Sequence, residues 1–176
     1  MTSAVEAAPA GVLRRLGAML YDALALTAVL MAATFPFVPF LDGRVLVPEE
    51  VGALAYVYWL WQLCIVTLFF GFFWTRRGQT IGMLAWRLRI ERIDGSNLRW
   101  ADALRRLMWV ALLCSPLMVG LPLIWNDWPE PARKAAVVAA FLPLCAAYAW
   151  IWIDPARRAW HDRWSGTRVM ALPKRK

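Results

Sequence analysis

The sequence predicts an all-α membrane protein: a polytopic bundle of four transmembrane helices, with a short amphipathic strand–turn segment at the membrane interface between the second and third. Three observations support this fold class. Hydrophobic residues make up 61% of the 176 positions, more than a water-soluble domain usually carries. Long runs without charged side chains alternate with short basic segments, and such runs are long enough to cross a bilayer. Several of the 12 tryptophans stand near the ends of these runs, where an indole ring favours the headgroup region.

The first predicted transmembrane helix covers residues 16–38. Arg14 and Arg15 precede it, and Pro36 ends it because proline lacks the backbone N–H that helical hydrogen bonding needs. The apolar run is longer than the core of a signal peptide, so we expect an uncleaved helix. The following loop, 41–50, is net acidic and contains an Asp-Gly turn signal, which is typical of the outer side.

The second predicted helix, residues 51–74, contains no charged residue and returns the chain to the first side. The segment 76–106 that follows it carries eight arginines. Within this segment, Leu88 and Ile90 alternate with charged side chains in the period of a short strand, which an Asp-Gly pair ends. We therefore expect a strand–turn element between the two helical hairpins.

The third helix is predicted to begin at Ser96 or Asn97, because either is a good N-cap residue, and to cross the membrane over 107–125. The fourth covers 135–153. Prolines occur inside both helices, and transmembrane helices commonly tolerate such prolines. The loop between them is predicted to lie on the outer side.

The distribution of positive charge predicts the orientation. Of the 20 Lys and Arg residues, 17 lie before the first helix, in segment 76–106 or after residue 153. Because basic loops are retained in the cytoplasm during insertion, we expect both termini and segment 76–106 to be cytoplasmic. Anionic lipid headgroups are the expected partner of these segments. Nucleic acid is not expected, because the charges bracket apolar runs and form no single basic stripe.

The residues give no support for catalysis, a metal site or a cofactor. All three cysteines lie inside apolar runs without metal-ligand spacing, and we interpret them as small buried hydrophobes. His161, Asp162 and Ser165 are the residue types of a hydrolytic triad, but three residues within so few positions rarely reach triad geometry. We therefore expect no enzyme activity. A titrating role near the membrane surface is the more plausible one for His161.

Asp22 is the ionisable residue nearest the interior of an apolar run. It follows Arg15 by two helical turns, so both side chains project from one face of the helix. Because a carboxylate facing lipid costs free energy, we expect Asp22 to face other helices or a wet cavity. Two roles stay open. Asp22 could bind a proton or cation, or it could pair with Arg105, Arg106 or an arginine of the tail and hold the bundle together.

Three segments of the sequence resemble the RDD family of small bacterial membrane proteins. They are RRLGAMLYD at 14–22, TIGMLAWRLRIERIDG at 80–95 and DPARRAWHDRWSGTRVM at 154–170. The arginine and two aspartates that give the family its name correspond to Arg15, Asp22 and Asp162. The resemblance implies a compact helical bundle with cytoplasmic termini in the bacterial inner membrane, and it suggests a transport function.

On this basis the chain is expected to consist of a disordered tail at 1–13, an RDD-like transmembrane domain at 14–172 and a basic tail at 173–176. The leading hypothesis is transport of a small ion or solute through a charged site on the cytoplasmic side. The residues of that site are Arg15, Asp22 and Asp162, with Arg105, Arg106 and His161 as secondary candidates. The alternative is a non-transporting scaffold or regulatory module that binds a partner protein. Four short helices enclose little volume, so transport would call for a homo-oligomer or a membrane-protein partner.

Overall fold

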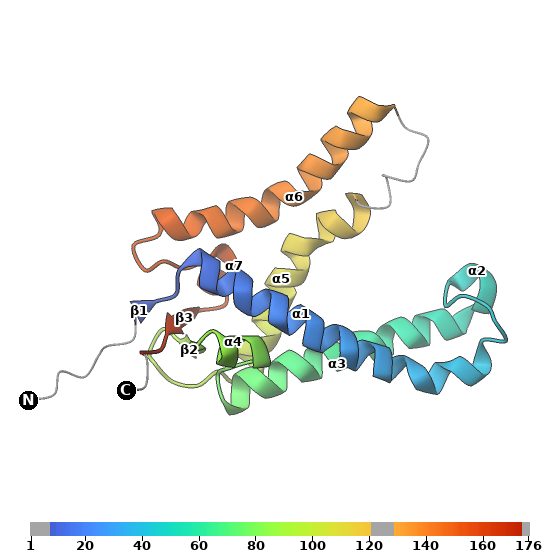
Figure 1. Cartoon of the computed structure of the whole chain (residues 1–176), viewed down its shortest axis with the longest axis horizontal. Coiled ribbons are helices and arrows are strands. Elements are labelled where there is room, and N and C mark those ends of the chain that lie inside the picture. The colour runs from blue at the N-terminus through green and yellow to red at the C-terminus, as the bar shows by residue number, and fades with distance from the viewer. Residues whose placement is uncertain (1–7, 121–128, 174–176) are drawn as a thin grey trace, which may run out of the picture.

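The computed structural model describes residues 8–120 and 129–173, in which two helical hairpins diverge from a small sheet (Figure 1). The first hairpin pairs α1 (Val12–Thr34) with α3 (Ala53–Arg76). The second pairs α5 (Trp100–Gly120) with α6 (Glu130–Ile153). The chain is thus mostly helical, as predicted.

Short elements connect the long helices. A 3₁₀ turn and α2 lie between α1 and α3; α4 and β2 lie between the hairpins; α7 and β3 follow α6. Their bounds are Phe35–Phe40 for the 3₁₀ turn, Pro48–Val51 for α2, Ile81–Ala85 for α4, Leu88–Arg92 for β2, Trp160–Trp164 for α7 and Thr167–Ala171 for β3.

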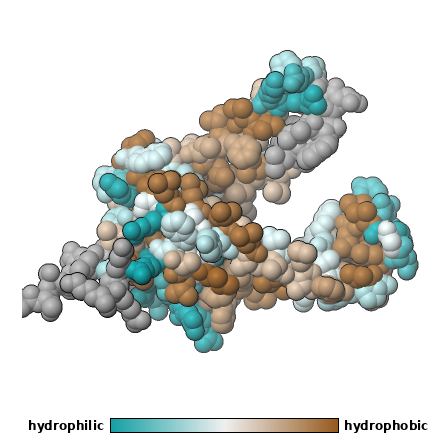
Figure 2. Space-filling view, in the orientation of Figure 1, coloured by the Kyte–Doolittle hydropathy of each residue, from teal (hydrophilic) through white to brown (hydrophobic). Residues whose placement is uncertain are grey.

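Three helices of the described residues are long and apolar enough to cross a membrane: Val12–Phe40, Ala53–Arg76 and Glu130–Ile153. They correspond to the first, second and fourth predicted transmembrane helices. Many of their large apolar side chains are exposed, and the space-filling view shows apolar residues along both hairpins (Figure 2). Such a surface suits a lipid environment, because water-soluble proteins rarely expose large contiguous apolar patches.

The third predicted helix, residues 107–125, lies partly outside the described residues. Its described part belongs to α5, which begins at Trp100 rather than at Ser96 or Asn97. The start is displaced because Asp102 accepts a hydrogen bond from the backbone N–H of Arg99, at 3.0 Å, and so caps the first turn.

Polar contacts join the two helices of the first hairpin. The side-chain amide of Gln62 on α3 donates to the carbonyl of Leu30 at 3.2 Å and to the hydroxyl of Thr34 at 3.1 Å, both on α1. The indole N–H of Trp61 donates to the carbonyl of Ala33 at 2.9 Å. Hydrogen bonds of this kind stabilise contacts between apolar helices that lipid would otherwise surround.

The sheet is antiparallel with the order β1–β3–β2. Its central strand, β3, pairs with β2 from Leu88 opposite Ala171 to Arg92 opposite Thr167. The predicted strand is confirmed as β2, and the alternation that predicted it is visible in burial, because Leu88 and Ile90 are fully buried. Both side chains belong to a core that also contains Val169 of β3.

Part of the predicted disordered tail 1–13, residues 8–13, has defined structure. Strand β1 (Ala8–Pro9) pairs with β3, and the backbone N–H of Ala10 donates to the carbonyl of Val169 at 2.9 Å. Ala10 is fully buried, and α1 begins at Val12. The all-α expectation therefore omitted a three-stranded sheet, of which only one strand was predicted.

Candidate functional site

Three charged side chains from distant parts of the sequence meet where α1, α5 and α7 converge. The carboxylate of Asp162 forms an ion pair with Nη1 of Arg15 and another with Nη1 of Arg106, the second at 2.5 Å. Asp162 is 0% exposed and each arginine is 5% exposed. We call these three residues the ion cluster. A buried carboxylate needs such partners, because burying an unpaired charge costs several kcal/mol.

Other N–H groups of the ion cluster bind the chain around it. Nε of Arg15 donates to the carbonyl of Ala10 at 3.1 Å, and its Nη2 donates to the carbonyl of Arg157 at 3.0 Å. Nη1 of Arg106 also donates to the hydroxyl of Thr167 at 2.7 Å. The ion cluster therefore fastens the segment that follows α6 to both α1 and α5.

His161 lies beside the ion cluster and is 3% exposed. Burial lowers its pKa to about 4; the nearby Asp162 opposes this shift, whereas Arg106 and Arg15 add to it. The imidazole is therefore neutral at pH 7. Burial alone would raise the pKa of Asp162, but the guanidinium groups of Arg106 and Arg15 more than offset burial and hold that pKa well below its usual range. The ion cluster thus carries one more positive charge than negative charge.

Asp22 lies on α1 but has partners of a different kind. Its Oδ2 accepts a hydrogen bond from the hydroxyl of Thr80 at 2.5 Å, and its Oδ1 accepts one from the backbone N–H of Gly82 at 2.7 Å. Thr80 is the N-cap of α4, and its hydroxyl oxygen accepts from the backbone N–H of Met83. Asp22 therefore holds the first turn of α4 against α1.

One of the two predicted roles of Asp22 is to pair with Arg105, Arg106 or an arginine of the tail. This pairing is not found among the described residues. Among the described residues, no basic side chain forms an ion pair with Asp22. Arg106 pairs with Asp162 instead, and Arg105, whose side chain is 51% exposed, pairs with Asp102 at 3.1 Å. Asp22 is nevertheless buried between helices, at 6% exposure, as the cost of lipid contact predicts.

The contact between α4 and α1 depends on a glycine. A Cβ atom at position 82 would lie 2.0 Å from the carbonyl oxygen of Ala18 and 3.0 Å from the carboxyl carbon of Asp22. Only a residue without a side chain lets α4 approach α1 this closely. The close approach brings the N–H of Gly82 within hydrogen-bonding distance of Asp22.

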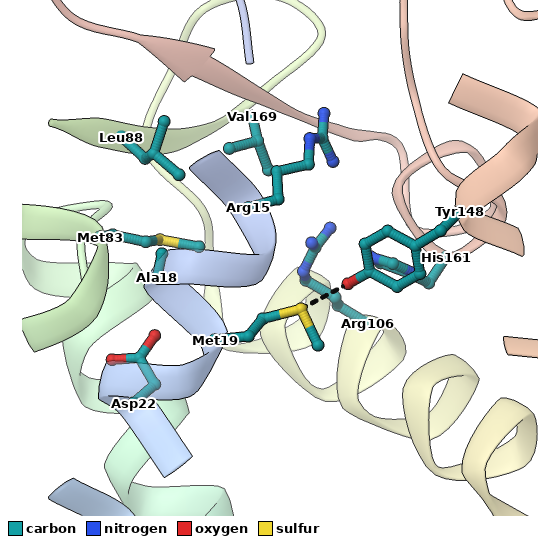
Figure 3. Close-up of a pocket in the computed structure, with 10 residues that line it drawn as sticks. All are labelled: Arg15, Ala18, Met19, Asp22, Met83, Leu88, Arg106, Tyr148, His161 and Val169. Atoms are coloured by element: carbon teal, nitrogen blue, oxygen red, sulfur yellow. Dashed lines mark hydrogen bonds between the residues drawn. The ribbon is translucent and has the colours of Figure 1, made fainter. Parts of the chain in front are cut away.

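Asp22 and both arginines of the ion cluster line one cavity of about 50 Å³ (Figure 3). Tyr148 of α6 and His161 of α7 complete its polar wall. The hydroxyl of Tyr148 donates to the sulfur of Met19 at 2.8 Å. A cavity of this size can hold water molecules or a small ion.

The structure brings together most of the residues that the sequence predicted. Arg15, Asp162, Arg106 and His161 are neighbours, Asp22 lines the same cavity, and Arg105 lies outside it. Thr80, Gly82 and Tyr148 were missed. A threonine before an apolar turn is a helix N-cap signal that could have identified Thr80, whereas Tyr148 stands in an apolar run without any distinguishing pattern.

Metal binding has no candidate site in the part of the chain that the structure describes. Within 8–120 and 129–173, no three His, Cys, Asp or Glu side chains are grouped so that they could hold an ion.

Comparison with known families gives one match. Residues 9–166 match the model of the RDD family, which confirms the resemblance carried by the three sequence segments. The matched range includes every residue of the ion cluster and Asp22. No curated protein and no solved structure matches the chain.

Replacing Gly82 by alanine should weaken the docking of α4 on α1. The added Cβ meets a backbone carbonyl that cannot move away alone, so we expect the free energy of unfolding to fall by about 1–3 kcal/mol. Gly11→Ala is the matched control, because no atom lies within 4 Å of a Cβ there and no positive φ is involved. Thermal unfolding of both variants in detergent measures the difference. Equal stability of the two variants would contradict the observed contact.

The depressed pKa of His161 predicts loss of stability in mild acid. The folded state binds no proton on His161 until the pH approaches 4, whereas the unfolded state binds one below about 6.5. The stability that neutral His161 contributes is therefore present above pH 6.5 and is lost as the pH falls toward 4. The free energy of unfolding should fall by about 2 kcal/mol between pH 7 and pH 5. The free energy of unfolding, measured between pH 7 and pH 5, should fall with pH in the wild type and fall less steeply in His161→Gln. Parallel slopes would show that another group is responsible.

Proposed function

This chain belongs to the RDD family, and from that membership and its apolar helices we propose that it transports a small ion or solute across the bacterial inner membrane. The observation that carries the proposal is the convergence of Arg15, Asp22 and Arg106 on one cavity near the junction of the hairpins. Ionisable side chains that face the inside of a helical membrane protein commonly mark the path of an ion or substrate.

The size of the cavity favours a small cargo. A cavity of about 50 Å³ suits a small ion or a small solute better than a large one. Met19 lines the cavity and is 42% exposed, so a rotation of its flexible side chain would open a path to the cavity. A homo-oligomer or a partner membrane protein could complete the path across the membrane.

The proposed orientation places both termini and segment 76–106 in the cytoplasm. The positive charge of these three segments supports it. The sheet gives independent support for a common side, because β1, β2 and β3 come one from each segment and are hydrogen-bonded to one another. The ion cluster would then lie near the cytoplasmic surface.

A scaffold or regulatory module is the second candidate function, and a specific observation favours it. Arg76, Arg77, Arg87 and Arg99 are exposed, and within the described residues none of them forms an ion pair with an acidic side chain. All four belong to the segment between the hairpins. Such a basic face could bind anionic headgroups or an acidic partner protein without any transport.

Labelling with a membrane-impermeant maleimide tests the orientation. In a variant without the native cysteines, Asp42→Cys should react from outside intact cells, because this side chain is 82% exposed in the loop after α1. Asp94→Cys, at a site 60% exposed in segment 76–106, should react only after the membrane is permeabilised. The reverse result would invert the proposed topology.

Two variants distinguish a role of Asp22 in transport from its role in holding α4 against α1. If Asp22 takes part in transport by ionising, Asp22→Asn should abolish flux into proteoliposomes, because asparagine cannot ionise. Thr80→Val removes the hydroxyl that donates to Asp22 but leaves the carboxylate, so it should retain flux in proportion to the folded fraction. Gradients of sodium, potassium, chloride and protons are tested in separate runs, and the melting temperature of each variant is measured.

The same measurements can refute the proposal. Full flux in folded Asp22→Asn would remove Asp22 from the transport site. Equal losses of flux and stability in both variants would show that Asp22 only supports α4. A folded wild-type protein that carries none of these ions would favour the scaffold.

A further inference from the structure

One N–H group of the ion cluster is left without an acceptor. Nη1 of Arg106 donates to Asp162 and to Thr167, but Nε is buried and has no hydrogen-bond partner among the described residues. Arg106 is only 5% exposed, and it lines the cavity. Because buried donors in native proteins are nearly always paired, this N–H group points to an acceptor that occupies the cavity.

The charge around the cavity indicates what kind of acceptor is needed. Two buried guanidinium groups share one buried carboxylate, that of Asp162, and the neutral His161 adds no charge. Asp22 also lines the cavity, but both of its oxygens already accept hydrogen bonds from the start of α4, toward which its carboxylate turns (Figure 3). The side of the cavity formed by the ion cluster is therefore positive and rich in donors.

A second donor faces the same space. The hydroxyl of Tyr148 donates to the sulfur of Met19, and a thioether is a weak acceptor. Rotation of this hydroxyl toward a better acceptor would cost little, because the bond that it gives up is weak. The side chain reaches toward Arg106 from α6, so the two donors approach the cavity from the two helices of the second hairpin (Figure 3).

We propose that this cavity is a binding site for a small inorganic anion of halide size, which accepts hydrogen bonds from Nε of Arg106 and from the hydroxyl of Tyr148. Arg15 contributes charge, since its own N–H groups already bind Asp162 and two carbonyls. The small volume, about 50 Å³, favours a compact inorganic anion over a large organic one. The proposal concerns anion binding alone. It goes beyond the proposed transport, because an anion could occupy the cavity in a protein that transports nothing.

Bromide identifies the occupant directly, because it replaces chloride and scatters X-rays anomalously. The full chain is crystallised in bromide, and an anomalous difference map is calculated at the bromine absorption edge. We expect a peak within hydrogen-bonding distance of Nε of Arg106. A map without a peak there, whether it is empty or shows adventitious surface ions only, would overturn the proposal.

Thermal stability gives a second test in solution. Bromide should raise the melting temperature of the purified protein more than gluconate at equal ionic strength, because gluconate is too large for the cavity. In Tyr148→Phe the half-saturating bromide concentration should rise roughly threefold to tenfold, the value of one hydrogen bond. Tyr58→Phe is the matched control, because it loses a hydroxyl that binds Gln62 within the first hairpin and should keep the wild-type response.

The outcomes of the binding test differ from those of the flux test. A wild type that responds equally to bromide and gluconate, or a Tyr148→Phe variant with unchanged half-saturation, would overturn the anion site. An absence of flux would leave the binding result as it stands, because binding is measured on the isolated protein.

Discussion

The carboxylate of Asp162 is fully buried, and it can remain ionised there only while Arg15 and Arg106 both contact it. This requirement determines how the chain is assembled, because the three residues belong to α1, α5 and α7. Only the short α4 and β2 lie between the two hairpins among the described residues, and the same carboxylate holds the proposed cytoplasmic ends of both hairpins in one place. Loss of Asp162 would leave two buried guanidinium groups without a counter-charge, and breaking a buried ion pair in this way typically costs about 3–5 kcal/mol. The sheet, the short α4 and the cavity are all arranged around this junction.

Sequence patterns predicted the local elements better than the contacts between them. Long apolar runs predicted four transmembrane helices, of which three are found among the described residues, and the alternation around Leu88 predicted β2, because both signals depend on near neighbours in the chain. β1 and β3 carry no comparable alternation and exist because they pair with each other and with β2. The partners of Asp22 were missed for a different reason. A search for opposite charge cannot find a carboxylate that is satisfied by a hydroxyl and a backbone N–H. Arg105 and Arg106 were indistinguishable in sequence, and only the rotation of α5 decides which one is buried.

The charged side chains of the site join the helices, and some of them also line a cavity. The ion cluster is well satisfied by hydrogen bonds and has the features of a structural junction. The guanidinium group of Arg106 lies over the ring of Trp74, at 5.4 Å from its centroid, but its Nε has no hydrogen-bond acceptor among the described residues. A junction that holds the bundle together could thus also hold a small ion, and any movement of one hairpin relative to the other would change the ion's surroundings. This link between helix position and ion binding is what a transporter requires, and it is also a means by which a scaffold could respond to ions.

The antiparallel pairing of β1 and β2 with β3 has a consequence for the order of biosynthesis. The partners of the first described residues are synthesised much later than these residues, since Arg15 and Asp162 are separated by 147 positions. All the long helices are therefore synthesised before the strand that ties their ends together exists. Until then Arg15 and Arg106 must be accommodated by solvent or by lipid phosphates, and the two hairpins are free to take other relative positions. The native arrangement of the two hairpins is consequently completed only after α7 and β3 have been synthesised.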